Sequence, residues 1–300
     1  MAMNDLLITC SWCTLRIGLD GAGLPRSDIC EVVAQGDGLY YGLAAGHSNS
    51  IWLAARRALV SDAGHPADER GVVMDLSEEP PALTATPDMP LRDLHGIGSY
   101  LETLWVACSY DDMVGIYHRL TEEWTWWQPM PLADSAGPDQ YHFNTIFFED
   151  ELVWLLAHRR GPSWLLAFPI GDALAGRTVA PVEKLVLGEQ AHNIWRQPDG
   201  ELCTCSSIEG LLLGDRGWRL ETGGFPRGIA ETNTGWALGI SALKERKDRD
   251  FSDARLQLYN FEWQRYSEFL LPDVGMVLDI LVIPSITKLP TVGTLPLAAS

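Results

Sequence analysis

The sequence has little positive charge and no long apolar run. It carries 22 Lys and Arg residues against 40 Asp and Glu residues, which gives a formal net charge of −18. A protein that binds nucleic acid needs a basic surface to displace counterions from phosphate, so this balance argues against a nucleic-acid partner. Apolar runs stay below the roughly 18 residues that a membrane-spanning helix needs, so we expect no membrane partner either.

Targeting and redox signals are also scarce. The first residues, MAMNDLLITCSW, lack the basic start and long apolar stretch of a signal peptide, so we expect a cytoplasmic protein. Its six cysteines are then expected to be thiols, because disulfides are rare in the cytoplasm. Cys10 and Cys13 have C-x-x-C spacing, but no second pair accompanies them, and we expect a packing role.

The motifs of several large enzyme classes are absent. The chain contains no G-x-S-x-G nucleophile turn, no phosphate-binding P-loop and no G-x-G-x-x-G dinucleotide motif. Covalent serine hydrolysis, nucleoside triphosphate use and a Rossmann-type cofactor therefore have no support. A content of 46% hydrophobic residues with 12 tryptophans still provides ample material for a core, and we expect most of the tryptophans to lie there.

The chain does contain a recurring pattern. A polar residue, usually His, is followed by isoleucine, a short turn and an apolar strand. The pattern reads LHGIGSYLETLWVACSY from Leu94, YHFNTIFFEDELVWLLAH from Tyr141 and AHNIWRQPDGELCTCSS from Ala191. A fourth copy, PRGIAETNTGWALGIS, carries Arg227 in place of His. The residues at the start of the four copies, His95, His142, His192 and Arg227, lie 47, 50 and 35 residues apart. Repeats with spacings of this size are typical of architectures such as propellers.

Two further segments fit the pattern in part. ICEVVAQGDGLYYGLA places Cys30 at the His position, and MVLDILVIPS fits the first half of a copy that begins near Met276. Six units then start near residues 30, 95, 142, 192, 227 and 276, and each divides into short β-type runs separated by turn residues. Four short strands in each unit predict an all-β, six-bladed β-propeller that forms a single domain over residues 1–300.

The incomplete sixth unit indicates how the two ends of the chain are used. MVLDILVIPS supplies one strand, and the segments DLLITCS and TLRIGLD resemble the next two strands of the same blade. We therefore expect N- and C-terminal strands to close the propeller together. The pattern leaves open whether residues 287–300 supply the outer strand of that blade.

The repeat places three histidines at one recurring position. His95, His142 and His192 begin successive units, and the first strands of propeller blades line the channel, so we expect their imidazoles to meet. Three imidazoles with an open position suit a divalent metal such as Zn²⁺, Fe²⁺, Mn²⁺ or Cu²⁺. Two alternatives stay open: the histidines hold neighbouring blades in register, or they act as acid and base without a metal.

Further polar residues are expected on the same face as these histidines. Arg227 is expected to bind substrate charge or stabilise an oxyanion, and Asn144 and Asn193 are candidate substrate ligands. His47 and His158 lie in loop-like segments and are candidates for a general acid or base.

Basic residues in two loops favour an anionic substrate. Arg159 and Arg160 form one group, and the segment KERKDRD from Lys244 forms the other. A locally basic face on an acidic protein would attract a carboxylate or phosphate. The alternative is that KERKDRD is a solvated, self-paired loop.

The chain resembles the six-bladed β-propellers, in particular an uncharacterised bacterial propeller family, over nearly its whole length. The H-G-I motif at His95 and the H-x-N-x-I motif at His142, which begin two of the units, carry this resemblance. The resemblance implies the fold and says little about function. More distantly, the architecture is similar to gluconolactonases, virginiamycin-type lyases and strictosidine-synthase-like proteins, which implies small-molecule chemistry, in several cases with a divalent metal. Gluconolactonase-like sites are rich in Glu, Asp and Asn, whereas the matching positions here hold histidines, so those reactions are not carried over.

Two functions from different classes follow. The first is a metal-dependent enzyme that acts on a small, anionic metabolite by elimination, isomerisation, cyclisation or hydrolysis, for example in secondary metabolism. The second is a non-catalytic propeller that binds a protein or glycan through exposed rings such as Trp124, Trp126 and Trp127. His142→Ala separates them, because it would abolish turnover in the first case and leave partner binding intact in the second.

Overall fold

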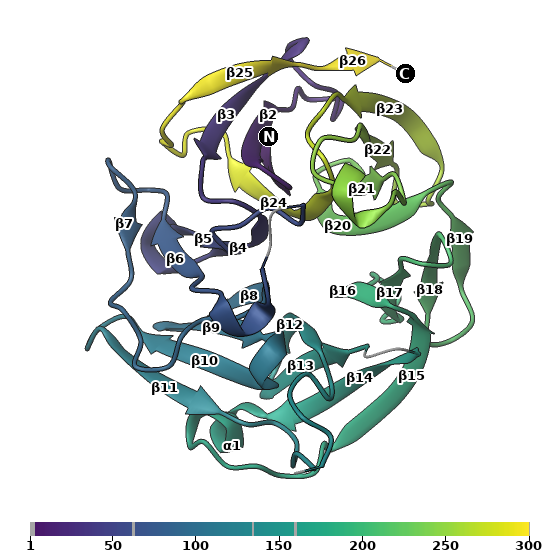
Figure 1. Ribbon diagram of the computed structural model, residues 1–300. Coiled ribbons are helices and arrows are strands. Elements are labelled where there is room, and N and C mark those ends of the chain that lie inside the picture. Colours follow the sequence, from purple (N-terminus) through teal and green to yellow (C-terminus); the bar gives the residue numbers. More distant parts are fainter. Residues whose placement is uncertain (1–3, 62–63, 134, 159–160, 300) are drawn as a thin grey trace. The chain divides into compact units, whose positions relative to one another are not determined.

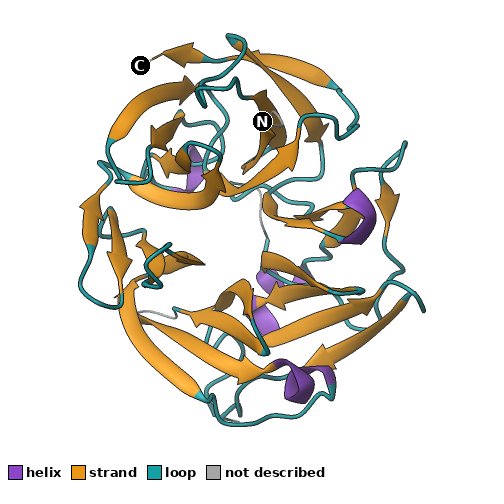
Figure 2. Ribbon diagram, turned by 180° about the vertical axis from the view of Figure 1, so that it is seen from behind, coloured by secondary structure: helices purple, strands orange, loops and turns teal. Residues whose placement is uncertain are grey.

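The computed structural model describes residues 4–61, 64–133, 135–158 and 161–299. In this part of the chain nearly all regular structure is β, and the single α-helix, α1 (Ile170–Leu174), is short (Figure 2). Six antiparallel sheets form the blades of a six-bladed β-propeller, which confirms the predicted fold class. No described helix has both the length and the apolar character that crossing a bilayer requires.

The chain divides into two compact units, and each is described by itself. The first unit comprises Met1–Ala63, Val73–Leu83 and Gly224–Ser300, and the second comprises Gly64–Val72 and Thr84–Gly223. Each unit holds three of the six sheets. The expectation of one domain over residues 1–300 stays a prediction.

One sheet of the first unit joins segments from both ends of the chain. Its order is β24 (Val277–Pro284), β1 (Asn4–Cys10), β2 (Cys13–Gly18), β3 (Ile29–Gln35) and β25 (Gly293–Pro296). In Figure 1 the yellow strand β24 lies beside the purple N-terminal strands. This pairing confirms that N- and C-terminal strands complete one blade. It also answers the question about the tail, since β25 pairs with β3 at the sheet edge.

The other two sheets of the first unit change one predicted boundary. The first has the order β20 (Phe225–Thr232), β21 (Gly235–Ser241), β22 (Ala254–Tyr259), β23 (Arg265–Leu271) and β26 (Ala298–Ala299). The second has the order β4 (Tyr40–Ala45), β5 (Ile51–Ala55), β6 (Val72–Asp75) and β7 (Ala82–Leu83). This blade therefore starts at Tyr40, which corrects the start expected near Cys30. Strand β3, which contains Cys30, pairs with β2 in the neighbouring sheet instead.

The three sheets of the second unit follow the chain in simple order. The first contains β8 (Leu94–Tyr100), β9 (Thr103–Cys108), β10 (Met113–His118) and β11 (Glu123–Trp127). The second contains β12 (Phe143–Glu149), β13 (Leu152–Ala157), β14 (Pro162–Pro169) and β15 (Glu183–Glu189). The third contains β16 (Ala191–Arg196), β17 (Leu202–Ser206), β18 (Leu211–Gly214) and β19 (Arg219–Glu221). These strands begin close to the predicted starts near 95, 142 and 192.

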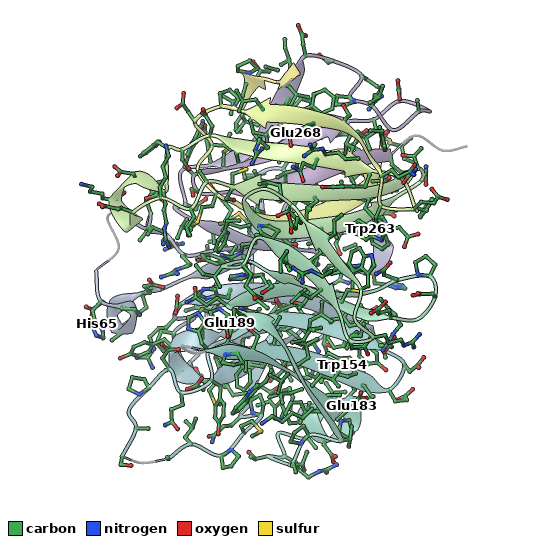
Figure 3. All side chains as sticks on the ribbon, turned by 90° about the vertical axis from the view of Figure 1, so that its right-hand side faces the viewer. His65, Trp154, Glu183, Glu189, Trp263 and Glu268 are labelled. Carbon is green, nitrogen blue, oxygen red and sulfur yellow. The ribbon has the colours of Figure 1, made fainter. Side chains whose placement is uncertain are left out.

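Aromatic side chains fill the space between the sheets of the second unit. Trp105 on β9 is fully buried, and its ring meets those of Trp127 and Phe148 edge-on, with centroids 5.9 and 5.3 Å apart. Trp154 on β13 is also buried, whereas Glu183 on the outer strand β15 of the same sheet is exposed (Figure 3). The predicted core role of these tryptophans is confirmed, and the packed sheets hold the first strands β8, β12 and β16 in place.

Candidate metal site in the second unit

Each first strand of the second unit contains a bulge close to its start. The register with the second strand shifts at Leu94/Gly96, Phe143/Thr145 and His192/Ile194. A bulge bends a strand and changes the direction of the side chain at that point. The residues skipped in the strand register at the three bulges are His95, Asn144 and Asn193.

The close approach of β8 to β12 explains why a glycine, Gly96, follows His95 in the first copy of the repeat. A Cβ atom built on Gly96 would lie 2.6 Å from the carbonyl oxygen of Asn144. Any larger residue would push β8 away from β12, so glycine permits the close approach of these two strands. The approach brings the side chains at their starts together.

The residue directly before each of these strands has a left-handed backbone. Asp93, His142 and Gln190 have φ angles of 50°, 55° and 44°. In the repeat, His142 therefore matches Asp93, and Asn144 matches His95. This corrects the predicted equivalence of His142 with His95 and His192. His142 reaches the site because a left-handed residue turns the chain sharply before the strand begins.

Asp93, His95 and His142 form a group that could hold a metal ion. One ligand atom from each residue lies within 4.8 Å of the other two. The ring centroids of His95 and His142 are 4.6 Å apart. Among the described residues, no such group includes His192. The structure thus brings two predicted ligands together and places a carboxylate where the third imidazole was expected.

Hydrogen bonds fix the ring of His95. Its Nδ1 lies 2.9 Å from the carbonyl oxygen of Asp93 and 2.9 Å from Oγ of Ser109. The Ser109 hydroxyl donates its single proton to the carbonyl oxygen of Phe143 at 2.6 Å, so towards His95 it can only accept. Nδ1 therefore carries the ring proton, and Nε2 carries the lone pair that a metal ion requires.

His142 is oriented by two carboxylates. Its Nδ1 donates to Oδ1 of Asp139 at 2.8 Å, and its backbone N–H donates to Oδ1 of Asp112 at 3.0 Å. A carboxylate accepts only, so the Nδ1 of this ring also carries a proton and Nε2 again carries the lone pair. Both histidines thus have the second hydrogen bond that metal-binding imidazoles normally make.

Asp112 holds the chain segment in front of β12. Its buried carboxylate accepts the backbone N–H groups of Gln140, Tyr141 and His142. Burial raises the pKa of the Asp112 carboxyl, and the three N–H bonds oppose this shift. The carboxylate therefore positions His142 through its backbone.

Two further imidazoles lie next to this group. His158 directly follows β13, in the loop between second and third strands where it was predicted. Its ring centroid lies 4.5 Å from that of His142 and 5.2 Å from that of His192. Nδ1 of His192 lies 2.8 Å from Oγ of Ser207, as Nδ1 of His95 does beside Ser109. His158 thus stands between a member of the metal group and His192.

The serine positions were missed by the sequence analysis, although the sequence carries a signal for them. In four of the six blades the second strand ends at or just before a serine: Ser11, Ser109, Ser207 and Ser241. Besides the histidine contacts of Ser109 and Ser207, Ser241 and Ser11 accept the backbone N–H groups of Val277 and Met276 at 3.0 Å. A recurring serine after an apolar run, as in ITCS, VACS and LGIS, would have marked these positions.

The predicted substrate ligands of the second unit differ in their surroundings. The side chain of Asn144 is buried, donates to the carbonyl oxygen of Ala191 at 2.8 Å and accepts from Thr145 Oγ1 at 2.9 Å. The first bond joins β12 to β16, and the two bonds together engage both ends of the amide. Asn193 is half-buried with a left-handed φ of 59°. Arg159 and Arg160 lie outside the described residues, so the substrate-binding roles stay predictions.

Arg227 lies in the first unit, at a bulge of β20 between Pro226 and Ile229. It is 5% exposed, and its guanidinium carbon lies 4.8 Å from the centroid of the Tyr41 ring. Tyr41 is at the bulge of β4, the position expected for Cys30. Cys30 itself is buried in β3, with its thiol 3.5 Å from the carbonyl oxygen of Leu295.

His47 does not lie at the end of the blade where it was expected. It is exposed in a short 3-10 helix (His47–Asn49) between β4 and β5, which are the first and second strands of their sheet. The start of β4 and the end of β5, where Tyr41 and Arg56 lie, are at the opposite end of this hairpin. The predicted placement of His47 beside the substrate site is corrected, because the blade begins at Tyr40 and not near Cys30.

The basic loop is exposed and partly self-paired. Lys247 pairs with Glu245 at 3.5 Å, and Arg249 donates to the carbonyl oxygen of Lys244 at 2.9 Å. The lysine and glutamate side chains are 74% and 79% exposed, so their attraction is weak. These contacts favour the alternative of a solvated loop over a dedicated anion site.

The tryptophans proposed for partner binding are not equally accessible. Trp127 is fully buried, whereas Trp124 and Trp126 are half-buried on the outer strand β11. Their rings are stacked, with centroids 6.0 Å apart and an interplanar angle of 17°. Trp124 Nε1 also donates to the carbonyl oxygen of Ala85 at 2.7 Å. Two of the three rings can therefore reach solvent in part.

Comparisons with known proteins support the fold. No family model matches the chain, and no curated protein matches it. The chain is similar to a chain in the crystal structure of a nidogen/laminin complex, with 11% identity, a TM-score of 0.63 and coverage of 93% of this chain and 98% of that chain. It is also similar to a protein of unknown function from Bacteroides caccae, with 11% identity, a TM-score of 0.60 and coverage of 94% and 99%.

A third solved structure, described as a streptogramin B lyase, has 10% identity, a TM-score of 0.49 and coverage of 90% of this chain and 86% of that chain. At such identities the likeness concerns the fold alone. The chemistry has to be argued from the residues of this chain.

Proposed function

We propose that the protein is a metal-dependent enzyme that acts on a small, anionic metabolite. The observation that carries the proposal is the group of Asp93, His95 and His142, whose ligand atoms lie within 4.8 Å of one another. Two imidazoles and one carboxylate leave coordination positions for water or substrate. Imidazole and carboxylate donors are compatible with all four ions expected from the sequence, Zn²⁺, Fe²⁺, Mn²⁺ and Cu²⁺.

The hydrogen bonds around the group support this proposal. Here the two rings direct Nδ1 to Asp93, Ser109 or Asp139, so both Nε2 atoms keep a lone pair. Fixed outer partners of this kind raise the metal affinity of the ligands they orient.

A divalent metal ion bound by this group would limit the reactions that the site could catalyse. A bound divalent ion would act as a Lewis acid or lower the pKa of a bound water. Neutralised by one carboxylate only, it would keep a net positive charge and favour an anionic substrate group. His158, beside His142, would form a hydrogen bond with the substrate. Elimination, isomerisation, cyclisation and hydrolysis are the reactions we propose to test.

A cytoplasmic setting is part of the same proposal. All six cysteines are among the described residues, and none of them forms a disulfide. Reduced thiols agree with a protein that stays in a reducing compartment. A nucleic acid is not proposed as a partner, because the net charge is −18. A membrane is not proposed either, because the apolar runs of the sequence stay short.

Elemental analysis of purified, tag-free protein tests the metal. We expect about one equivalent of metal in the wild type and none in His95→Ala, His142→Ala or Asp93→Asn, because each removes a ligand. His118→Ala is the matched control, since His118 lies on β10 and its Nε2 bonds to Thr125 Oγ1. Absence of metal in the wild type, even after exposure to Zn²⁺, Fe²⁺, Mn²⁺ and Cu²⁺, would sink the proposal.

His192→Ala separates the two versions of the site. If Asp93 is the third ligand, this variant keeps its metal, because His192 lies outside the group. Loss of metal in His192→Ala with retention in Asp93→Asn would restore the three-histidine site and reject the Asp-His-His assignment.

Catalysis is tested by incubating the metal-loaded protein with pooled carboxylate and phosphate metabolites and following their consumption by NMR. We expect turnover that disappears on chelation and in His142→Ala. A protein that binds metal but consumes nothing would favour the non-catalytic alternative. In that case the half-buried pair of Trp124 and Trp126 is the first surface to examine, by Trp126→Ala on glycan and protein arrays.

A further inference from the structure

A second cluster of charged side chains lies in the first unit, outside the metal group. Arg227 from β20 and Arg56, which follows β5, both face the ring of Tyr41 from β4. Their guanidinium carbons lie 4.8 and 5.4 Å from the ring centroid. Arg227, Arg56 and Tyr41 are only 5%, 6% and 6% exposed. Two buried guanidinium groups beside one ring are unusual, because removing each full positive charge from water costs free energy.

Arg227 is the member that points to a ligand. Among the described residues, no carboxylate forms an ion pair with it. Burial lowers the pKa of its guanidinium, while Tyr41 and then Asp279 oppose the shift. The Asp279 carboxylate accepts the backbone N–H groups of Leu43 at 3.0 Å and Ile280 at 2.9 Å. A guanidinium stays charged in proteins, so a buried one without an ion pair is stabilised when an anion joins it.

The backbone around Arg227 is built to hold this side chain in place. The bulge between Pro226 and Ile229 takes Arg227 out of the regular ladder of β20. Gly228 follows with a φ of +76°, and a Cβ atom there would lie 3.0 Å from the backbone of Asp279. Glycine therefore lets β20 pack closely against β24, its neighbour in Figure 1.

We propose that Arg227, stacked on Tyr41, binds an oxyanion: the carboxylate or phosphate group of a small molecule. The planar fork of a guanidinium matches two oxygens of either group, and stacking on an aromatic ring fixes the plane of the fork in advance. Arg56 adds a second positive charge at the same ring. This site goes beyond the proposed function and does not depend on the metal.

The test uses acetate and inorganic phosphate as probes, each titrated into the whole protein at constant ionic strength with chloride as the counter-titrant. We expect at least one probe to raise the melting temperature and to bind in calorimetry, because a ligand of the native state stabilises it. Arg227→Met should weaken that binding by at least about tenfold, since it removes the charge and the fork. Arg227→Lys should bind more weakly than the wild type, because it keeps the charge and loses the fork.

Two controls keep the proposal falsifiable. Arg26→Met changes another arginine of the first unit, one that already pairs with Asp5 at 2.6 Å, and should bind both probes as the wild type does. His142→Ala should also bind them normally, which separates failure of this site from failure of the metal site. If Arg227→Met does not fold, Arg227→Lys decides the question.

The probes also distinguish the ligand. Binding of acetate alone identifies a carboxylate, and binding of phosphate alone identifies a phosphate. A wild type that responds to neither probe at millimolar concentrations, or an Arg227→Met variant with unchanged binding, would overturn the proposal.

Discussion

The two units use the same repeat position for opposite chemistry. At the bulge of the first strand, the second unit places His95, which belongs to the group of Asp93, His95 and His142 that could hold a metal ion. At the corresponding bulge, the first unit places Arg227, a permanent cation against Tyr41. In our two proposals, the first position would bind a cation and the second an anion. The blade provides the place and direction of a side chain, and the side chain alone decides which charge the site accepts.

Exchanging these two residues is the strongest way to break the comparison. We expect His95→Arg to reduce the metal content from about one equivalent to none, because a guanidinium offers no lone pair and repels the ion. Arg227→His should leave the metal content unchanged and abolish the binding of acetate or phosphate. Elemental analysis and calorimetry on the same samples measure both effects. Metal retained in His95→Arg would show that this bulge does not decide the site.

Asp112 tests whether the segment before β12 is needed to position His142. Asp112→Ala removes the acceptor of three backbone N–H groups. We expect the free energy of unfolding, measured in urea, to fall by about 3 kcal/mol. Metal affinity should fall with it. The adjacent Asp111, paired with the partly exposed Arg92, is the control, and Asp111→Ala should cost less than about 1 kcal/mol. Equal losses in both variants would contradict the role of Asp112.

Ser109 and Ser241 offer a matched pair across the two units. Ser109→Ala removes the hydroxyl that accepts from His95 Nδ1, and we expect metal affinity to fall by about 10- to 100-fold in a chelator competition. Ser241→Ala removes the equivalent hydroxyl beside Val277 and should leave metal affinity within error of the wild type. A similar fall in both variants would mean that the serines act through general stability.

A buried thiol in the core of the first unit gives the smallest expected effect, and this effect depends on pH. Burial raises the pKa of Cys30 in the first unit from 9.0 to about 11. Because this folded pKa lies above the unfolded one, the contribution of Cys30 to stability is complete below pH 9 and is lost as the pH rises towards 11. We expect Cys30→Ala to reduce the loss of unfolding free energy over that range by roughly 2 kcal/mol. Urea unfolding at several pH values measures it, and identical slopes for variant and wild type would reject the shift.

The fold could be predicted from the sequence because each repeat has a recognisable pattern of residue types. Alternating strands, recurring His and Ile, and two N-terminal strands that complete the last unit predict the propeller and the sheet that joins both ends. The sequence did not predict in the same way that the blade containing β4 begins at Tyr40. The runs around Cys30 and Tyr40 resemble one hairpin, and only the pairing of β3 with β2 assigns them to different sheets.

The metal group could be predicted only in part. Residues 95 and 142 look equivalent when the histidines are aligned, yet alignment on Ile97 and Ile146 places His142 opposite Asp93 and Asn144 opposite His95. That alignment would have revealed the carboxylate of the group. The direction of the His142 side chain depends on a left-handed backbone held by Asp112, and no spacing rule predicts such a contact.

The two short C-terminal strands of the first unit have a consequence for handling the protein. Strand β25 covers the outer edge of β3, and β26 pairs with the outer edge of β23. Uncovered strand edges are templates for pairing with another chain. A truncation or bulky fusion that displaces residues 293–299 would expose two edges at once, and aggregation during expression would follow even though no part of either candidate site had been changed.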